Sequence, residues 1–155
     1  GVVDGYSGGD FKPTDVLTRG AAAKIICNLI LGPTTASALS ASSAPFKDVP
    51  VSNTFAGYIT YCAQEKIING YPDGTFRPDK NVTRAELMAM INRATGRAPK
   101  SADAFLPGMK TWIDNTSDKW YYLDVQEATN SHSYTVKGSE TWTALTSDPN
   151  WSLYE

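Results

Sequence analysis

The stretch GYPDGTFRPDKNVTRAELMAMINRATG, residues 70–96, decides how this chain folds. Pro72–Asp73–Gly74 is typical of a tight turn, because proline fixes φ and glycine accepts a positive φ. We expect residues 67–71 and 75–76 to be extended, so the turn would close a short hairpin. A helix is predicted from Thr83 onward. Its buried face is predicted at Leu87, Met88, Ile91 and Ala94.

The same pattern begins 65 residues earlier, because residues 1–26 align with residues 66–91 without a gap. The positions that are identical in both copies are Gly5, Tyr6, Gly9, Phe11, Pro13, Thr18, Arg19 and Ile26, matching Gly70, Tyr71, Gly74, Phe76, Pro78, Thr83, Arg84 and Ile91. Identities spread through an ungapped alignment are a strong sign of a structural repeat. The offset also carries the predicted buried helix face to Ala22, Ala23, Ile26 and Leu29.

A second, weaker repeat involves the half of the motif that precedes residues 66–91. Here FKDVPVSNTFAGYITYCAQ from Phe46 matches WIDNTSDKWYYLDVQEATN from Trp112. Each segment continues into an apolar pattern of helical spacing, which predicts a helix over residues 55–66. We therefore divide a single module, residues 1–155, into three repeats. They are the second half of repeat 1 (1–31), a complete repeat 2 (46–96) and a divergent repeat 3 (112–155), which departs from the pattern at Ser131.

The composition excludes several classes of function. Among 155 residues, 14 basic and 16 acidic side chains leave a net charge of −2, which disfavours sequence-independent binding to nucleic acid. The best apolar run, residues 21–31, is interrupted by Lys24 and Asn28 and is too short to cross a membrane. No nucleophile motif surrounds His132, the single histidine, so we expect no catalytic activity.

The two cysteines, Cys27 and Cys62, each fall in a helical apolar pattern. Buried free thiols are favoured over a disulfide, and both remain open. Two cysteines and one histidine do not make a metal-ligand set, so neither a metal nor a cofactor is expected.

Residues 70–96 closely resemble the second half of an S-layer homology (SLH) motif, and residues 46–49 with the following helix resemble its first half. Residues 1–31 match more loosely, and residues 112–132 match the first half alone. The resemblance implies a mainly α fold with short β hairpins, whose repeats pack as a pseudo-threefold helical bundle. It also implies a surface module, part of a larger secreted protein, that binds a secondary cell-wall polymer of Gram-positive bacteria. In that family the polymer often carries a pyruvate ketal.

Thr83 and Glu86 fit a capping box, in which each side chain binds the backbone of the other residue. Arg84 is not explained in this way, because the macrodipole disfavours a cation in the first turn of a helix. An arginine beside free helix amides suits a carboxylate ligand instead. Arg19 recurs in the same register after its own cap, Thr18, although Ala21 replaces the glutamate of the box.

The resemblance implies that Arg84 is a main polymer contact and that Tyr71, Asp73 and Gly74 help to line its site. Arg19 would form a weaker second site. One alternative is a structural or protein-interaction module that binds other surface proteins and has lost polymer binding. The aromatic side chains of the third repeat fit either sugar stacking or core packing, with packing favoured. They are Trp112, Trp120, Tyr121, Tyr122, Trp142 and Trp151.

Overall fold

The computed structural model describes residues 2–3, 8–136, 139–150 and 152. The chain divides into two compact units, Gly1–Met90 and Ile91–Glu155, and each is described by itself. Five α-helices, a 3-10 turn and one two-stranded sheet make up the regular structure of the described residues. The prediction of a mainly α fold is therefore confirmed, and the described residues also include one short hairpin.

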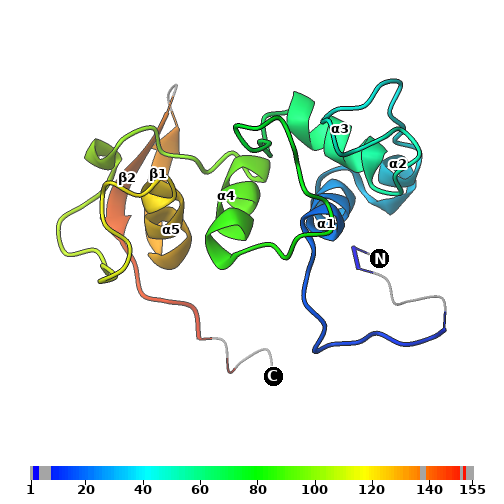
Figure 1. The fold of residues 1–155 in the computed structure, drawn as a ribbon. Coiled ribbons are helices and arrows are strands. Elements are labelled where there is room, and N and C mark those ends of the chain that lie inside the picture. Colours follow the sequence, from blue (N-terminus) through cyan, green and yellow to red (C-terminus); the bar gives the residue numbers. More distant parts are fainter. Residues whose placement is uncertain (1, 4–7, 137–138, 151, 153–155) are drawn as a thin grey trace. The chain divides into compact units, whose positions relative to one another are not determined.

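Three helices lie together in the first unit: α1 (Arg19–Leu31), α2 (Pro33–Ser37) and α3 (Ala56–Gln64) (Figure 1). Thr18 caps α1, since its hydroxyl accepts the Ala21 N–H at 3.2 Å. Gly20 of α1 lets the helix approach the Phe55 ring at the start of α3, because a Cβ at this position would lie 2.6 Å from the ring. The core side chains are mostly small or aliphatic. They include Ala22, Ala23, Ile26, Cys27, Val49, Ile59, Cys62, Ile67, Ile68 and Phe76.

The turn at residues 70–76 closes without a β-ladder. The Tyr71 N–H donates to the Thr75 carbonyl at 2.7 Å, and the Gly74 N–H donates to the Tyr71 carbonyl at 2.9 Å. The structure assigns no strand to this segment, so the hairpin predicted here is wrong. The N–H groups that flank the turn are bound elsewhere: those of Ile67 and Ile68 donate to the Cys62 carbonyl, and those of Phe76 and Arg77 donate to the Asp48 carboxylate.

The repeat is visible in the backbone itself. Gly74 has a φ of 81° and Arg77 a φ of 60°, and their counterparts Gly9 and Lys12 have φ values of 84° and 54°. A positive φ is uncommon for a side chain as large as arginine or lysine. At the offset of 65 residues, Gly9 therefore matches Gly74 and Lys12 matches Arg77 in the sign and approximate size of φ.

The two halves of the second repeat are joined by Asp48. Its carboxylate accepts the backbone N–H groups of Phe76 and Arg77, each at 2.7 Å. The Phe46 ring stacks on Phe76 with centroids 5.4 Å apart. A Cβ on Gly70 would lie 2.4 Å from the Phe46 ring, so glycine is needed where the two halves meet.

Helix α4 (Arg84–Ala94) begins in the first unit and ends in the second. The predicted apolar face is partly wrong. Ala89 and Met90 are buried, whereas Ile91 is 42% exposed. A polar side chain takes the next buried position, because the Asn92 amide donates to the Asp124 carbonyl at 2.9 Å. The predicted face of α1 holds except at Leu29, which is exposed near the end of the helix.

The second unit contains the 3-10 turn η1 (Ala102–Ala104), helix α5 (Tyr122–Thr129) and strands β1 (His132–Val136) and β2 (Glu140–Leu145). The strands pair antiparallel, with His132 opposite Leu145 and an irregularity after Ser133. The hairpin thus lies in the divergent third repeat, where none was expected. Trp142 fills the core of this unit and contacts the Phe105 ring at 4.6 Å.

Candidate functional site

Three cationic side chains surround the ring of Tyr71. The guanidinium carbons of Arg19 and Arg77 lie 4.8 and 4.4 Å from the ring centroid, and the Lys80 Nζ lies 5.1 Å away. The Lys80 ammonium also donates to the Tyr71 hydroxyl at 3.0 Å, and that hydroxyl donates to Glu86 Oε1 at 2.9 Å. The face of an aromatic ring attracts cations, so Tyr71 organises a basic cluster on the second repeat.

Arg19 reaches this cluster from the first repeat and is 6% exposed. Its Nε donates to the Phe76 carbonyl at 2.9 Å and its Nη2 to the Asn69 carbonyl at 3.1 Å. Its Nη1 forms an ion pair with Glu86 Oε1 at 2.7 Å. Arg19 therefore connects helix α1 to both the turn and the α4 cap of the second repeat.

The start of α1 is occupied by the second repeat as well. The N–H groups of Arg19 and Gly20 donate to the carbonyls of Lys80 and Pro78, at 2.9 and 2.8 Å. Since Thr18 accepts the next N–H, the first amides of α1 already have protein partners. The N–H groups of Arg19, Gly20 and Ala21 are therefore not free to bind an anion at this helix N-terminus.

Glu86 is the acidic centre of the cluster. The predicted capping box is present: Glu86 Oε2 accepts the Thr83 N–H at 2.8 Å, and the Thr83 hydroxyl accepts the Glu86 N–H at 3.2 Å. Burial alone would raise the pKa of this carboxyl. The hydrogen bonds from Thr83 and Tyr71 and the charge of Arg19 outweigh burial and hold the pKa below its usual 4.5. The carboxylate is thus both a cap and the partner of Arg19.

Acid should weaken the first unit through Glu86. Because its pKa is lower in the folded state, the carboxylate contributes stability above about pH 4.5, and this contribution is lost as the pH falls through the folded pKa. We expect the stability advantage of the native protein over Glu86→Gln to shrink as the pH falls from 6 to 3. Urea unfolding followed by far-UV circular dichroism at each pH measures it, and a constant difference would contradict the expectation.

Asp73 holds the turn and orients Arg77. Its carboxylate accepts the N–H and hydroxyl of Thr75, at 2.9 and 2.6 Å, and pairs with Arg77 Nη2 at 2.8 Å. These bonds, those from Thr75 first, lower the pKa of the Asp73 carboxyl strongly. The Lys47 ammonium donates to the Asp73 carbonyl at 3.0 Å and lies against Gly74.

The structure therefore brings Arg19, Tyr71, Asp73 and Gly74 into one neighbourhood. It adds three exposed cations that the sequence interpretation left out, namely Lys47, Arg77 and Lys80. The alignment did contain a signal for one of them, since Arg77 pairs with a second basic residue, Lys12, at the same offset.

Arg84 lies outside this network. It is the exposed first residue of α4, and its side chain forms no hydrogen bond or ion pair with any described residue. The N–H groups of Arg84 and Ala85 have no acceptor among the described residues either, because Thr83 caps the N–H of Glu86. Of the two related arginines, Arg19 is thus bound by the protein and Arg84 is available.

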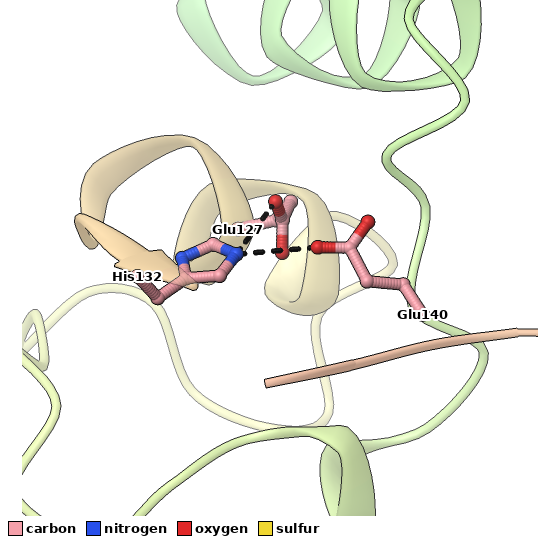
Figure 2. A group of neighbouring side chains, drawn as sticks. All are labelled: Glu127, His132 and Glu140. Atoms are coloured by element: carbon pink, nitrogen blue, oxygen red, sulfur yellow. Dashed lines mark hydrogen bonds and ion pairs between the residues drawn. The ribbon is translucent and has the colours of Figure 1, made fainter. Parts of the chain in front are cut away.

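A second charged cluster lies in the second unit, where the side chains of Glu127, His132 and Glu140 point toward one another (Figure 2). One ligand atom from each lies within 4.8 Å of the others, a spacing that a metal ion could use. The His132 Nδ1 donates to the Asn130 carbonyl at 2.7 Å, which directs Nε2 at the two carboxylates. That arrangement is common for a histidine that binds metal.

Arg97 occupies the place that an ion would take. Its Nη2 lies 2.5 Å from Glu127 Oε1 and 2.7 Å from His132 Nε2, and its Nε lies 3.5 Å from Glu140 Oε1. Burial raises the pKa of the Glu127 carboxyl, and the Trp142 N–H, His132 and Arg97 act against this effect. The guanidinium supplies a positive charge among these side chains, so the cluster is an ionic core for the hairpin.

The core-packing interpretation of the aromatic residues is wrong for two of them. Trp112 is 46% exposed and Trp120 is 63% exposed, while Trp142 is buried as expected. The Trp120 ring contacts the Tyr121 ring edge-to-face at 5.4 Å. Tyr121 and Tyr122 are both half-buried, and Trp151 lies outside the described residues.

The segments that carry the turn, the helix cap and both arginines match a known family. The model of the S-layer homology domain matches residues 1–23 and 45–88. The chain contains an SLH domain. The matched segments include Arg19, Tyr71, Asp73, Gly74 and Arg84, and they end before the buried ionic cluster of the second unit.

Proteins named for anchoring, for the cell surface or for the surface layer are among the relatives. A cellulosome-anchoring protein of Acetivibrio thermocellus is 49% identical over 119 residues, which are 75% of this chain and 25% of the relative. A surface layer protein of Brevibacillus choshinensis is 35% identical over 99 residues, 64% of this chain and 9% of the relative. Cell surface glycoprotein 1 of Acetivibrio thermocellus is 30% identical over 146 residues, 88% of this chain and 6% of the relative. The chain thus spans a quarter or less of the length of these proteins. None of the described helices combines the length and the apolarity needed to cross a membrane.

Proposed function

We propose that this SLH domain is a non-catalytic module that anchors a larger secreted protein to the cell wall of a Gram-positive bacterium. Its ligand would be an anionic secondary cell-wall polymer, with the carboxylate of a pyruvate ketal as the recognised group. The surface and wall proteins among the relatives support this location. In this proposal residues 1–155 form one module whose repeats pack with pseudo-threefold symmetry.

The observation that carries the proposal is the unpaired state of Arg84. An exposed guanidinium in the first turn of α4 gains nothing from the helix dipole, and it has no protein partner among the described residues. Beside it, the N–H groups of Arg84 and Ala85 lack acceptors in the described structure. A carboxylate could accept two bonds from the guanidinium and further bonds from these amides.

The basic cluster around Tyr71 would form a second part of the binding surface. Lys47, Arg77 and Lys80 are exposed, and the half-buried Tyr71 ring could also pack against a sugar. Asp73 and Gly74 would shape this surface by fixing the turn that carries Tyr71. Arg19 would contribute least, because protein acceptors already engage three of its five N–H donors.

Co-sedimentation with purified cell-wall sacculi tests the proposal. The protein should pellet with intact sacculi and remain in solution when the secondary polymer has been stripped. Arg84→Ala should weaken binding by about 10- to 100-fold, the loss expected for hydrogen bonds to a charged group.

Lys119→Ala is the matched control, since it also removes one exposed positive charge, in the second unit, and should bind like the native protein. Equal binding to intact and stripped sacculi would contradict polymer recognition. Unchanged binding by a folded Arg84→Ala protein would contradict the role of Arg84.

One observation favours a second candidate, a structural or protein-interaction module without polymer binding. Arg19, the counterpart of Arg84, is buried and serves to join the repeats. If Arg84 had an equivalent role toward a partner protein, the domain would capture that protein from surface extracts and would not pellet with sacculi. The two assays together separate the candidates.

A further inference from the structure

We propose that Cys27 and Cys62 form a disulfide that covalently joins the first repeat to the second. Their Sγ atoms lie 3.4 Å apart in the core of the first unit, and both residues are fully buried. Cys27 lies on α1 of the first repeat and Cys62 on α3 of the second, 35 positions later in the chain. The proposal is independent of glycan binding.

The surroundings leave the two thiols facing each other. Apart from their mutual contact, the Cys27 thiol donates weakly to the Tyr58 carbonyl at 3.6 Å, and the Cys62 thiol to the Ala23 carbonyl at 3.8 Å. Among the described residues, these thiols belong to no group of potential metal ligands. Closing the pair from 3.4 Å to a bonded S–S distance of about 2 Å needs a movement of little more than 1 Å.

The helices around the pair are already held at close range. Gly20 of α1 lies against the Phe55 ring at the start of α3, where a Cβ would come within 2.6 Å of the ring. At the start of α1, the N–H groups of Arg19 and Gly20 are bound to the second repeat. A disulfide would therefore add a covalent link to an interface whose geometry is fixed without it.

The reaction needs an oxidant, and a disulfide of low molecular weight or of a thiol oxidoreductase supplies it. The first step begins at the Cys27 thiol, and the same step can begin at Cys62. The Cys27 thiolate attacks the oxidant's disulfide and releases one thiol. The Cys62 sulfur then attacks Cys27 Sγ and releases the second thiol. Two electrons and both thiol protons pass to the oxidant, which leaves as two thiols.

Because both thiols are buried, we expect the exchange to occur while the chain folds or opens. The experiment refolds the whole chain in a buffer of oxidised and reduced glutathione and compares it with protein kept in a reductant. The oxidised protein should lose about 2 Da in intact mass and should show no thiol that reacts after denaturation. Its melting temperature, followed by far-UV circular dichroism, should rise by roughly 10 °C.

The double variant Cys27→Ser/Cys62→Ser is the control and should melt at one temperature in both buffers. Single variants should give a mixed disulfide with glutathione or remain as thiols. The proposal is overturned if the refolded native sequence keeps two reactive thiols, or if it forms disulfides only with glutathione or with a second chain. A disulfide that forms and lowers the melting temperature would overturn the claim that the folded geometry accepts it.

Discussion

Replacing Arg19 with methionine should destabilise the first unit by about 3–5 kcal/mol, the cost of removing one member of a buried ion pair. The change would leave Glu86 without its cationic partner and the carbonyls of Asn69 and Phe76 without a donor. Methionine keeps much of the packing against the Tyr71 and Phe76 rings, so the loss should come mainly from the polar contacts. Urea unfolding followed by far-UV circular dichroism measures it.

Arg84→Met is the matched control, because it changes the same residue type at the corresponding position of the next repeat. Its exposed side chain has no partner among the described residues, so its stability should change by less than about 0.5 kcal/mol. All four tryptophans follow residue 110, so their fluorescence reports on the second unit and should change little in either variant. Equal, small effects of the two variants on circular dichroism would show that the Arg19 contacts do not stabilise the fold.

This contrast explains why the sequence could predict that Arg19 and Arg84 occupy equivalent positions but could not predict their separate roles. A repeat aligns Arg19 with Arg84 and assigns them one role. Their environments differ because Arg19 meets the turn and cap of the second repeat, residues 69–86, in three dimensions. The contacts of Arg19 span 50 to 67 positions of the chain, and no local pattern reports on them.

Local features were predictable where the backbone N–H and carbonyl groups form hydrogen bonds with residues nearby in the sequence. The turn at Gly74 and the Thr83–Glu86 box each depend on bonds within a few residues, and both are present. The hairpin at residues 132–145 was missed because the sequence departs from the repeat at Ser131 and no element was predicted beyond it. A signal was available, since Thr, Val, Tyr and Trp are enriched in these strands, as is typical of a half-buried sheet.

The hairpin depends on charged residues that such a pattern does not reveal. Glu127 comes from α5, His132 from β1 and Glu140 from β2, and each side chain is nearly inaccessible to solvent. The His132 ring stacks on Trp142 at 4.0 Å, and the Trp142 N–H donates to Glu127 Oε2 at 2.7 Å. The sequence around His132 contains no nucleophile motif and predicted no role for it, because the partners of His132 are supplied by the tertiary fold.

Removing the Glu127 carboxylate should therefore lower the free energy of unfolding of the second unit more than a substitution at its surface does. In Glu127→Ala the Trp142 N–H loses its acceptor and Arg97 loses the nearest of its partners, at 2.5 Å, so we expect a loss of about 3–5 kcal/mol. Glu127→Gln should cost less, because the amide oxygen can still accept a bond from Trp142 and burying an amide avoids the desolvation that raises the Glu127 pKa. Asp118→Ala removes an exposed carboxylate paired with Lys119 and should change stability by less than about 0.5 kcal/mol.

Tryptophan fluorescence in a urea titration at pH 7 separates these three variants, since Trp142 is 2% exposed and contacts the cluster directly. The order of midpoints expected is Asp118→Ala highest, then Glu127→Gln, then Glu127→Ala. The raised pKa of Glu127 adds a pH test: the protonated carboxyl favours folding below about pH 4.5, and this contribution is lost as the pH rises through the folded pKa. The native protein should therefore gain stability relative to Glu127→Gln on acidification. If Glu127→Ala matched the Asp118 control, the ionic cluster would have no part in holding the hairpin on α5.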